Sequence, residues 1–117
     1  LLGHLLEMCQ GSNLSASIDV SAVPVLDAAV TDYIEAGCVP GGSQRNWQSI
    51  AQHISTISVE SQALLCDPQT SGGLLIAVNP VAADEVSSLL QEAGCYCQSI
   101  GTLADYYPSQ PTIDVKT

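Results

Sequence analysis

The segment of the chain best suited to chemistry is a short string that combines an acid, an amide, two hydroxyls and two glycines. Its residues are Asp67, Pro68, Gln69, Thr70, Ser71, Gly72 and Gly73. Glycine lets the backbone adopt positive φ and lets another group approach closely. A turn built from such residues can direct several N–H groups toward one anion or toward another loop. Two interpretations follow: a binding loop, or a tight connection in which Asp67 caps its own turn.

A second polar, glycine-rich segment lies earlier in the chain. The Pro40-Gly41 and Gly41-Gly42 pairs are strong breakers of regular structure, so we expect a loop through Asn46. Arg45 can supply a positive charge to a bound anion. Alternatively, Asn46 caps the helix that follows and the loop has only a structural role. The residues leave both interpretations open, and the capping interpretation needs no ligand.

The composition limits the classes of partner. The chain has 117 residues, of which 46% are hydrophobic, and it is expected to form a single domain over residues 1–117. Twelve acids oppose only two bases, Arg45 and Lys116, which gives a formal net charge of −10. This balance argues against nucleic acid and against anionic membrane surfaces as partners. It also leaves too few cations for a complete ATP site. The longest apolar run, Leu74–Val78, is too short to cross a bilayer.

The cysteines indicate a reducing compartment. They are Cys9, Cys38, Cys66, Cys95 and Cys97. An odd number without a secretory context predicts free thiols in a cytoplasmic protein. Their spacing does not match a zinc motif, so we expect buried small apolar side chains rather than a metal site.

Strand-like and helix-like patterns alternate along the chain. The expected strands cover residues 15–20, 74–78, 95–103 and 112–115, and the expected helices cover 1–10, 24–36, 47–54, 59–65 and 80–93. Ser58 and Asn79 are expected to cap helix starts, and Gly37 and Gly94 to end helices. The predicted fold is α/β (α+β): a two-layer sandwich with a mixed four-stranded sheet and helices packed on one side. The apolar run Leu74–Val78 is the expected central strand.

Four stretches resemble one known family in the same order. They are Gly3–Met8, Val23–Leu26, Pro40–Asn46 and Asp67–Leu75. They are similar to the C-terminal domain of the selenophosphate synthetase (selenide, water dikinase) family, whose fold is that of the aminoimidazole ribonucleotide synthetase-like superfamily. The string from Asp67 to Gly73 is the most specific match. The chain departs from the family pattern at Ser43, where the family usually has threonine, so a hydroxyl is kept.

The resemblance implies a parent enzyme that converts ATP, selenide and water to selenophosphate, AMP and phosphate. In the family, the reactive cysteine or selenocysteine, a lysine and most of the aspartates that bind Mg²⁺ and ATP lie in an N-terminal domain. We therefore expect this chain to be a C-terminal fragment that is inactive alone, without catalytic or metal-binding residues. Its partner would be the N-terminal domain of the same enzyme, and the parent would be a homodimer. The candidate residues for lining the cleft between the domains are Asp67, Gln69, Thr70, Ser71, Gly72, Gly73, Arg45 and Asn46.

Two other hypotheses remain open. The chain can be a free-standing module that binds a partner without chemistry. It can also be the same domain of a related ATP-dependent enzyme, such as thiamine-monophosphate kinase or a hydrogenase-maturation protein. The complete string from Asp67 to Gly73 argues against this last possibility.

Overall fold

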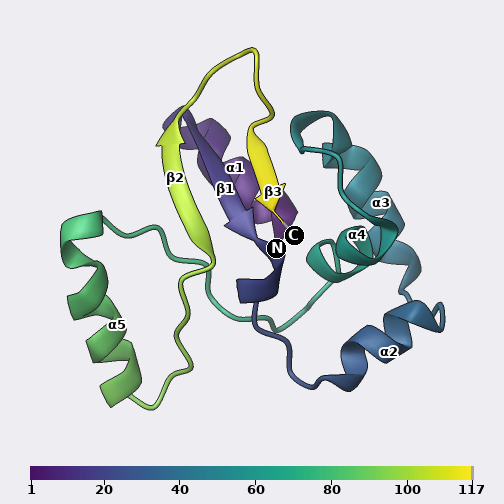
Figure 1. Cartoon of the computed structure of the whole chain (residues 1–117), viewed down its shortest axis with the longest axis horizontal. Helices are drawn as coiled ribbons and strands as arrows, with labels where there is room; N and C mark the ends of the chain where they lie inside the picture. Colours follow the sequence, from purple (N-terminus) through teal and green to yellow (C-terminus); the bar gives the residue numbers. More distant parts are fainter. Residues whose placement is uncertain (117) are drawn as a thin grey trace.

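The computed structural model describes residues 1–116 and combines a mixed three-stranded sheet with α-helices, which confirms the predicted α/β (α+β) class (Figure 1). The α-helices are α1 (Leu2–Ser12), α2 (Ala29–Glu35), α3 (Gly41–Ile50), α4 (Val59–Leu65) and α5 (Ala83–Glu92), the 3-10 turns are η1 (Val20–Ala22), η2 (Ala51–His53) and η3 (Pro80–Ala82), and the strands are β1 (Leu14–Asp19), β2 (Gly101–Asp105) and β3 (Ile113–Lys116). Within these described residues, no helix has both the length and the apolar character that a bilayer crossing requires.

The sheet has β1 at its centre, and the predicted fourth strand is absent from residues 1–116. Strand β2 pairs antiparallel with β1, placing Leu103 opposite Ala16, and β3 pairs parallel with β1 on its other side. The run Leu74–Val78 is extended but unpaired, so the prediction that it forms the central strand is wrong. Its apolar composition favours burial in a sheet, but a strand also needs a neighbour for its backbone hydrogen bonds. Both edges of β1 are already occupied.

The core forms where α1 packs against the sheet. Leu2, Leu5 and Cys9 lie on one face of α1 and are buried, as the apolar pattern of the segment predicts. In Figure 1, α1 lies behind β1 and β3. Asn13 adopts the left-handed conformation with φ 54°, which ends α1 and lets β1 begin at the next residue. The rest of the core comes from the sheet and from the α3–α4 region: Ala16, Ile18, Ile50, Ile54, Ile57, Leu65, Cys66, Ile113 and Val115.

Helices α3 and α4 are attached to the β3 side of the sheet through the segment between them. The N–H of Ser55 donates to the carbonyl of Ile113 at 2.9 Å, and its hydroxyl accepts from the N–H of Val115 at 2.8 Å. Helix α4 then begins as predicted, with the Ser58 hydroxyl accepting from the N–H of Ser61 at 3.1 Å. These bonds hold the segment that joins α3 to α4 beside β3 and start α4.

Helix α2 is shorter than the sequence predicts. It begins at Ala29 rather than near Pro24, because the Asp27 carboxylate accepts from the N–H of Ala29 at 2.8 Å and holds the chain in a turn. Leu26 is consequently exposed instead of lying on a helical face. Gly37, at φ 80°, ends α2 as predicted.

Helix α5 begins later than predicted and lacks the predicted burial: Asn79 caps the 3-10 turn η3, in which Pro80 is the first residue, and α5 itself begins at Ala83 without a side-chain cap. Asn79 accepts from the N–H of Val81 at 3.0 Å, and Gly94, at φ 76°, follows the last turn. No residue of α5 is buried, however, and Figure 1 shows the helix apart from the sheet, between two extended segments. The following strand is also shorter than predicted: it begins at Gly101, and of residues 95–100 only Ile100 bonds to β1, its carbonyl accepting from the N–H of Asp19 at 2.9 Å.

Candidate functional site

The second glycine-rich segment is helical, which contradicts the predicted loop. Residues 41–46 form the first part of α3, and Pro40 precedes the helix without any side-chain cap. The N–H of Ser43 donates to the carbonyl of Pro40 at 2.9 Å and closes the first turn. Asn46 lies inside the helix, so the prediction that it caps a helix is wrong. Pro40, with φ −60° and ψ 138°, starts α3 without an Asn side chain.

The structure brings the two predicted segments together. The side-chain amide of Asn46 donates to the carbonyl of Cys66 at 2.9 Å, at the end of α4. One turn earlier, Gly42 packs against the ring of Pro68, and a Cβ on Gly42 would lie 2.9 Å from Pro68 Cγ. Only glycine fits at that distance without displacing the ring. Residues 41–46 thus contact the beginning of the turn, and we call residues 41–46 and 67–73 together the α3–turn surface.

The polar side chains of the turn are mostly exposed. Gln69, Thr70 and Ser71 are exposed and Asp67 is half-buried. None of these four side chains has a hydrogen-bond partner within residues 1–116, so Asp67 does not cap its own turn. The side-chain oxygen of Gln69 lies over Gly72, where an added Cβ would come within 2.7 Å of it. Gly73 has open space around it. The turn therefore presents its hydroxyls outward instead of using them to close itself.

The α3–turn surface carries both signs of charge. The N-terminus of α3 offers backbone N–H groups at the positive end of its dipole. Arg45 Nη2 lies 3.8 Å from the Cβ position of Gly42, so the guanidinium folds back over the first turn. On the other side, the Asp67 carboxylate and the Cys66 thiol lie near Leu1. Burial raises the pKa of the Cys66 thiol, which favours its neutral form.

Residues 1–107 match the family described as "AIR synthase related protein, C-terminal domain". The chain belongs to this family. It is similar to the selenide, water dikinase of Colwellia psychrerythraea, with 51% identity over 115 residues that cover 98% of this chain and 33% of the relative. It is 48% identical to the selenide, water dikinase of Haemophilus ducreyi, with the same two shares covered. A selenide, water dikinase from a Shewanella species is 54% identical over 90 residues, which cover 77% of this chain and 25% of the relative.

These comparisons confirm the resemblance that the four sequence stretches indicate. The chain spans 33% or less of the length of these relatives. Two of the four stretches, Pro40–Asn46 and Asp67–Leu75, contain the α3–turn surface. A third, Gly3–Met8, lies in α1, whose start is beside this surface because Leu1 lies close to Cys66 and Asp67.

In this member of the AIR synthase related C-terminal domain family, one hydroxyl of the surface is buried and unsatisfied. Ser43 is 2% exposed, and its Oγ has no hydrogen-bond partner within residues 1–116. A buried polar group without a partner costs about 1–3 kcal/mol. The family resemblance indicates that position 43 keeps a hydroxyl, as serine instead of threonine. It does not indicate that this hydroxyl is buried.

The described part of this family member does not offer a metal site. Within residues 1–116, no three His, Cys, Asp or Glu side chains come together as possible ligands. The residues present therefore do not fit a Mg²⁺ centre, and we assign no metal ligand to them. Cys9 and Cys66 are buried as predicted, whereas the same prediction is wrong for Cys38 and Cys95, which are exposed. Cys97 is half-buried.

Proposed function

We propose that this chain is the C-terminal domain of a selenide, water dikinase, a single domain over residues 1–117. The α3–turn surface would be one wall of the cleft that faces the rest of the enzyme. The intact parent would convert ATP, selenide and water to selenophosphate, AMP and phosphate. Support comes from the relatives that carry this name and from the extent of this chain that resembles them.

The observation that carries the proposal is the combination of tight packing and free polar groups in the α3–turn surface. The Gly42–Pro68 contact and the Asn46–Cys66 hydrogen bond hold the beginning of the turn against α3. A turn with a purely structural role uses its polar side chains on its own backbone. Here Thr70 and Ser71 are exposed and unpartnered within residues 1–116, two and three positions after Pro68, which packs against Gly42. This arrangement suits preorganised donors for a group that arrives from outside.

The proposed roles follow from the chemistry of each group. Thr70, Ser71 and the amides of Gly72 and Gly73 would donate hydrogen bonds to an anionic oxygen or to a closing segment. Arg45 would supply positive charge beside them. Asp67, Gln69 and Asn46 would hold the backbone of the α3–turn surface in the shape that presents these donors. These roles remain proposals for each of the eight residues.

The remaining machinery would come from the rest of the parent. Its N-terminal domain would provide the reactive residue and the groups that bind ATP and Mg²⁺. Leu1 lies near Asp67, and this nearness supports the proposal that the N-terminal domain of the parent would lie next to the α3–turn surface. We further propose that the parent is a cytoplasmic homodimer.

The test compares the isolated chain with the intact parent enzyme. The chain alone should produce no AMP from ATP in the presence of selenide, and the parent should produce it. In the parent, Thr70→Val and Ser71→Ala should each lower kcat/KM by about tenfold or more, since each removes a donor from a preorganised site. Thr102→Val, on the exposed face of β2, is the matched control and should leave the rate unchanged.

Two results would contradict the proposal. AMP production by the isolated chain would show that the missing machinery is not needed. Wild-type kcat/KM in both the Thr70 and the Ser71 variants would reduce the α3–turn surface to a structural connection and would favour a partner-binding module.

A further inference from the structure

The start of α3 lacks the groups that normally satisfy the first turn of a helix. The first N–H groups of any α-helix have no partner inside the helix itself. Pro40 precedes α3 and supplies no side-chain cap, and the first turn contains no acidic residue. The N–H of Ser43 bonds to the carbonyl of Pro40, but the N–H groups of Gly41 and Gly42 have no partner within residues 1–116. Two donors are therefore free at the positive end of the helix dipole.

A buried hydroxyl beside these donors is also unsatisfied. Ser43 Oγ is the one buried side-chain nitrogen or oxygen without a hydrogen-bond partner in the described residues 1–116. Ser43 is the third residue of α3, and the Cα–Cβ bonds of a helix tilt toward its N-terminus, so this side chain is directed toward the first turn. A polar side chain at the third position commonly bonds to the N–H of the residue before the helix. That residue is Pro40, which has no N–H.

The side chains around this turn do not supply the missing acceptor. Arg45 folds back over it, with Nη2 3.8 Å from the Cβ position of Gly42, but a guanidinium only donates hydrogen bonds. Asp67 lies in the adjoining turn, yet its carboxylate does not cap α3. Two free N–H groups, a hydroxyl and a positive charge together suit an oxygen acceptor that comes from outside residues 1–116.

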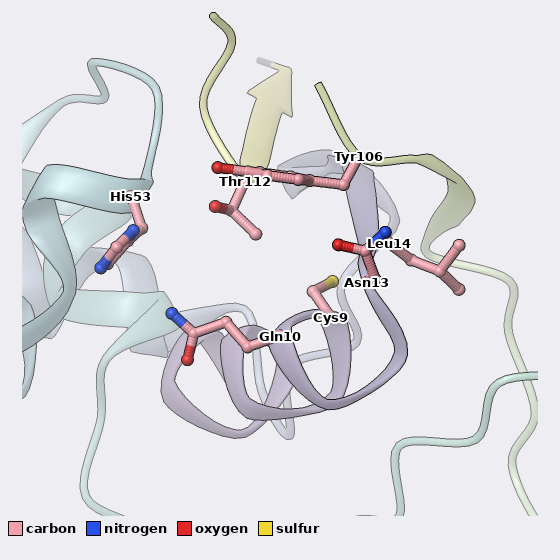
Figure 2. Close-up of a pocket in the computed structure, with 7 residues that line it drawn as sticks. All are labelled: Cys9, Gln10, Asn13, Leu14, His53, Tyr106 and Thr112. Carbon is pink, nitrogen blue, oxygen red and sulfur yellow. The ribbon is translucent and has the colours of Figure 1, made fainter. Parts of the chain in front are cut away.

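The opposite end of α1 offers no comparable site. A depression at the C-terminal end of α1 is open to solvent, and the side chains of Gln10 and Asn13 lie on different sides of it (Figure 2). Within residues 1–116, none of its lining residues holds a buried polar atom without a partner. The unsatisfied hydroxyl therefore directs attention to the start of α3.

The first residue of the chain lies beside this part of the fold. Leu1 is near Cys66 and Asp67. Cys66 accepts the Asn46 hydrogen bond from α3, and α1 also contacts α3. The chain covers 33% of the length of two selenide, water dikinase relatives. A segment that precedes Leu1 in the proposed parent would therefore join the chain next to the start of α3.

We propose that the segment directly before Leu1 in the parent caps α3. An oxygen of this segment accepts from the N–H groups of Gly41 and Gly42, and the Ser43 hydroxyl turns about its Cα–Cβ bond to donate to the same segment. No covalent step is involved. The cap rests on the proposed function, because it needs a longer parent, and it names the partner of this end of the α3–turn surface. Since Gly42 contacts Pro68, a capped first turn also steadies the beginning of the turn at residues 67–73.

The test measures hydrogen–deuterium exchange at residues 40–45 by mass spectrometry in three proteins. They are the 117-residue chain, the same chain preceded by about ten residues of the parent, a length that reaches up to about 35 Å when extended, and the intact parent. Exchange should be about tenfold slower in the second and third proteins, because a bonded N–H exchanges only when its bond opens. Equal exchange in all three would overturn the proposal. Slowing in the parent alone would assign the cap to another part of the enzyme and would also overturn it.

Ser43→Ala tests the hydroxyl, with different results expected in the two contexts. In the 117-residue chain the hydroxyl has no partner, so its removal should leave the midpoint of thermal unfolding unchanged or raise it. In the parent it should speed exchange at residues 40–45 about three- to tenfold, because a hydrogen bond is lost. Ser49→Ala is the matched control in the same helix. Its hydroxyl bonds to the Asn46 carbonyl at 2.7 Å, so exchange at residues 40–45 should stay unchanged in both proteins.

The outcomes separate this cap from the proposed function. A lower midpoint for Ser43→Ala in the 117-residue chain, or wild-type exchange in the parent variant, would contradict the cap. A parent that produces AMP but shows no slowing at residues 40–45 would keep the proposed function and overturn the cap. A parent that produces no AMP but shows the slowing would keep the cap and refute the proposed reaction.

Discussion

Helices α1 and α5 have similar sequence patterns and opposite environments. Each has an apolar stripe at helical spacing, yet α1 buries Leu2, Leu5 and Cys9, whereas α5 buries nothing. Helix α1 packs on β1, while α5 contacts mainly the short turn η3 that leads into it. The comparison shows that a stripe identifies which face of a helix is apolar, but not what covers that face.

The contrast extends to the segments that flank α5. Leu74 is 91% exposed and Val81 is 97% exposed. Tyr96, on the other flank, is also exposed. Such an accumulation of exposed apolar side chains is typical of a region that another protein segment covers. The core around α1 is complete by itself, and the region from residue 74 to residue 100 is not.

The largest expected effect separates these two regions directly. Leu65→Ala removes a fully buried side chain and should lower the free energy of unfolding by about 2–5 kcal/mol. Leu89→Ala removes the same atoms from α5, where the residue is 58% exposed. This substitution should change the free energy of unfolding by about 0.5 kcal/mol or less. Urea unfolding followed by circular dichroism measures both. Equal losses would show that α5 is covered in solution.

A smaller effect tests the packing of the α3–turn surface. Gly42→Ala places a methyl group against the Pro68 ring and should destabilise the chain by about 1–3 kcal/mol. Gly41→Ala, one position earlier in the same helical turn, meets open space and should be neutral or slightly stabilising, since alanine favours helix. Thermal unfolding of the two variants compares them. Similar midpoints would mean that Gly42 and Pro68 are not in contact.

The smallest expected effect is a dependence of stability on pH. It should arise from the buried thiol of Cys66 in the core and not from an exposed thiol. Burial raises the pKa of the Cys66 thiol in the folded chain, so the unfolded chain loses this proton first. Stability should be complete below the unfolded pKa of about 8.5 and should fall as pH rises above it. Replacing Cys66 by alanine should make the decline in unfolding temperature between pH 8 and pH 10 shallower. Cys38→Ala, at an exposed site, should keep the wild-type decline, and identical slopes in both variants would contradict this cause.

Features that depend on neighbouring residues were predictable from the sequence. Ser58 and Asn79 cap helix starts, and Gly37 and Gly94 follow helix ends in the left-handed region. Each of these roles is decided within a few residues of backbone, where the available hydrogen-bond partners are local. The face of α1 that is buried was predictable for a similar reason, because one apolar stripe had one sheet to cover.

Features that depend on distant partners were not predictable in the same way. Leu74–Val78 has the composition of a central strand but pairs with no strand of the sheet, and Asn46 has the side chain of a cap but bonds to Cys66, 20 residues away. The depression at the C-terminal end of α1 draws its residues from separate segments, none of which carries a recognisable motif.

The sequence by itself determined the α/β class, the local ends of most helices and the family resemblance, since these depend on patterns within short windows. Only the tertiary structure decided that residues 41–46 and 67–73 form one surface, and that α5 is left uncovered. Hydrogen-bond partners and packing neighbours far apart in the chain are chosen by the whole fold, and composition alone carries no record of that choice.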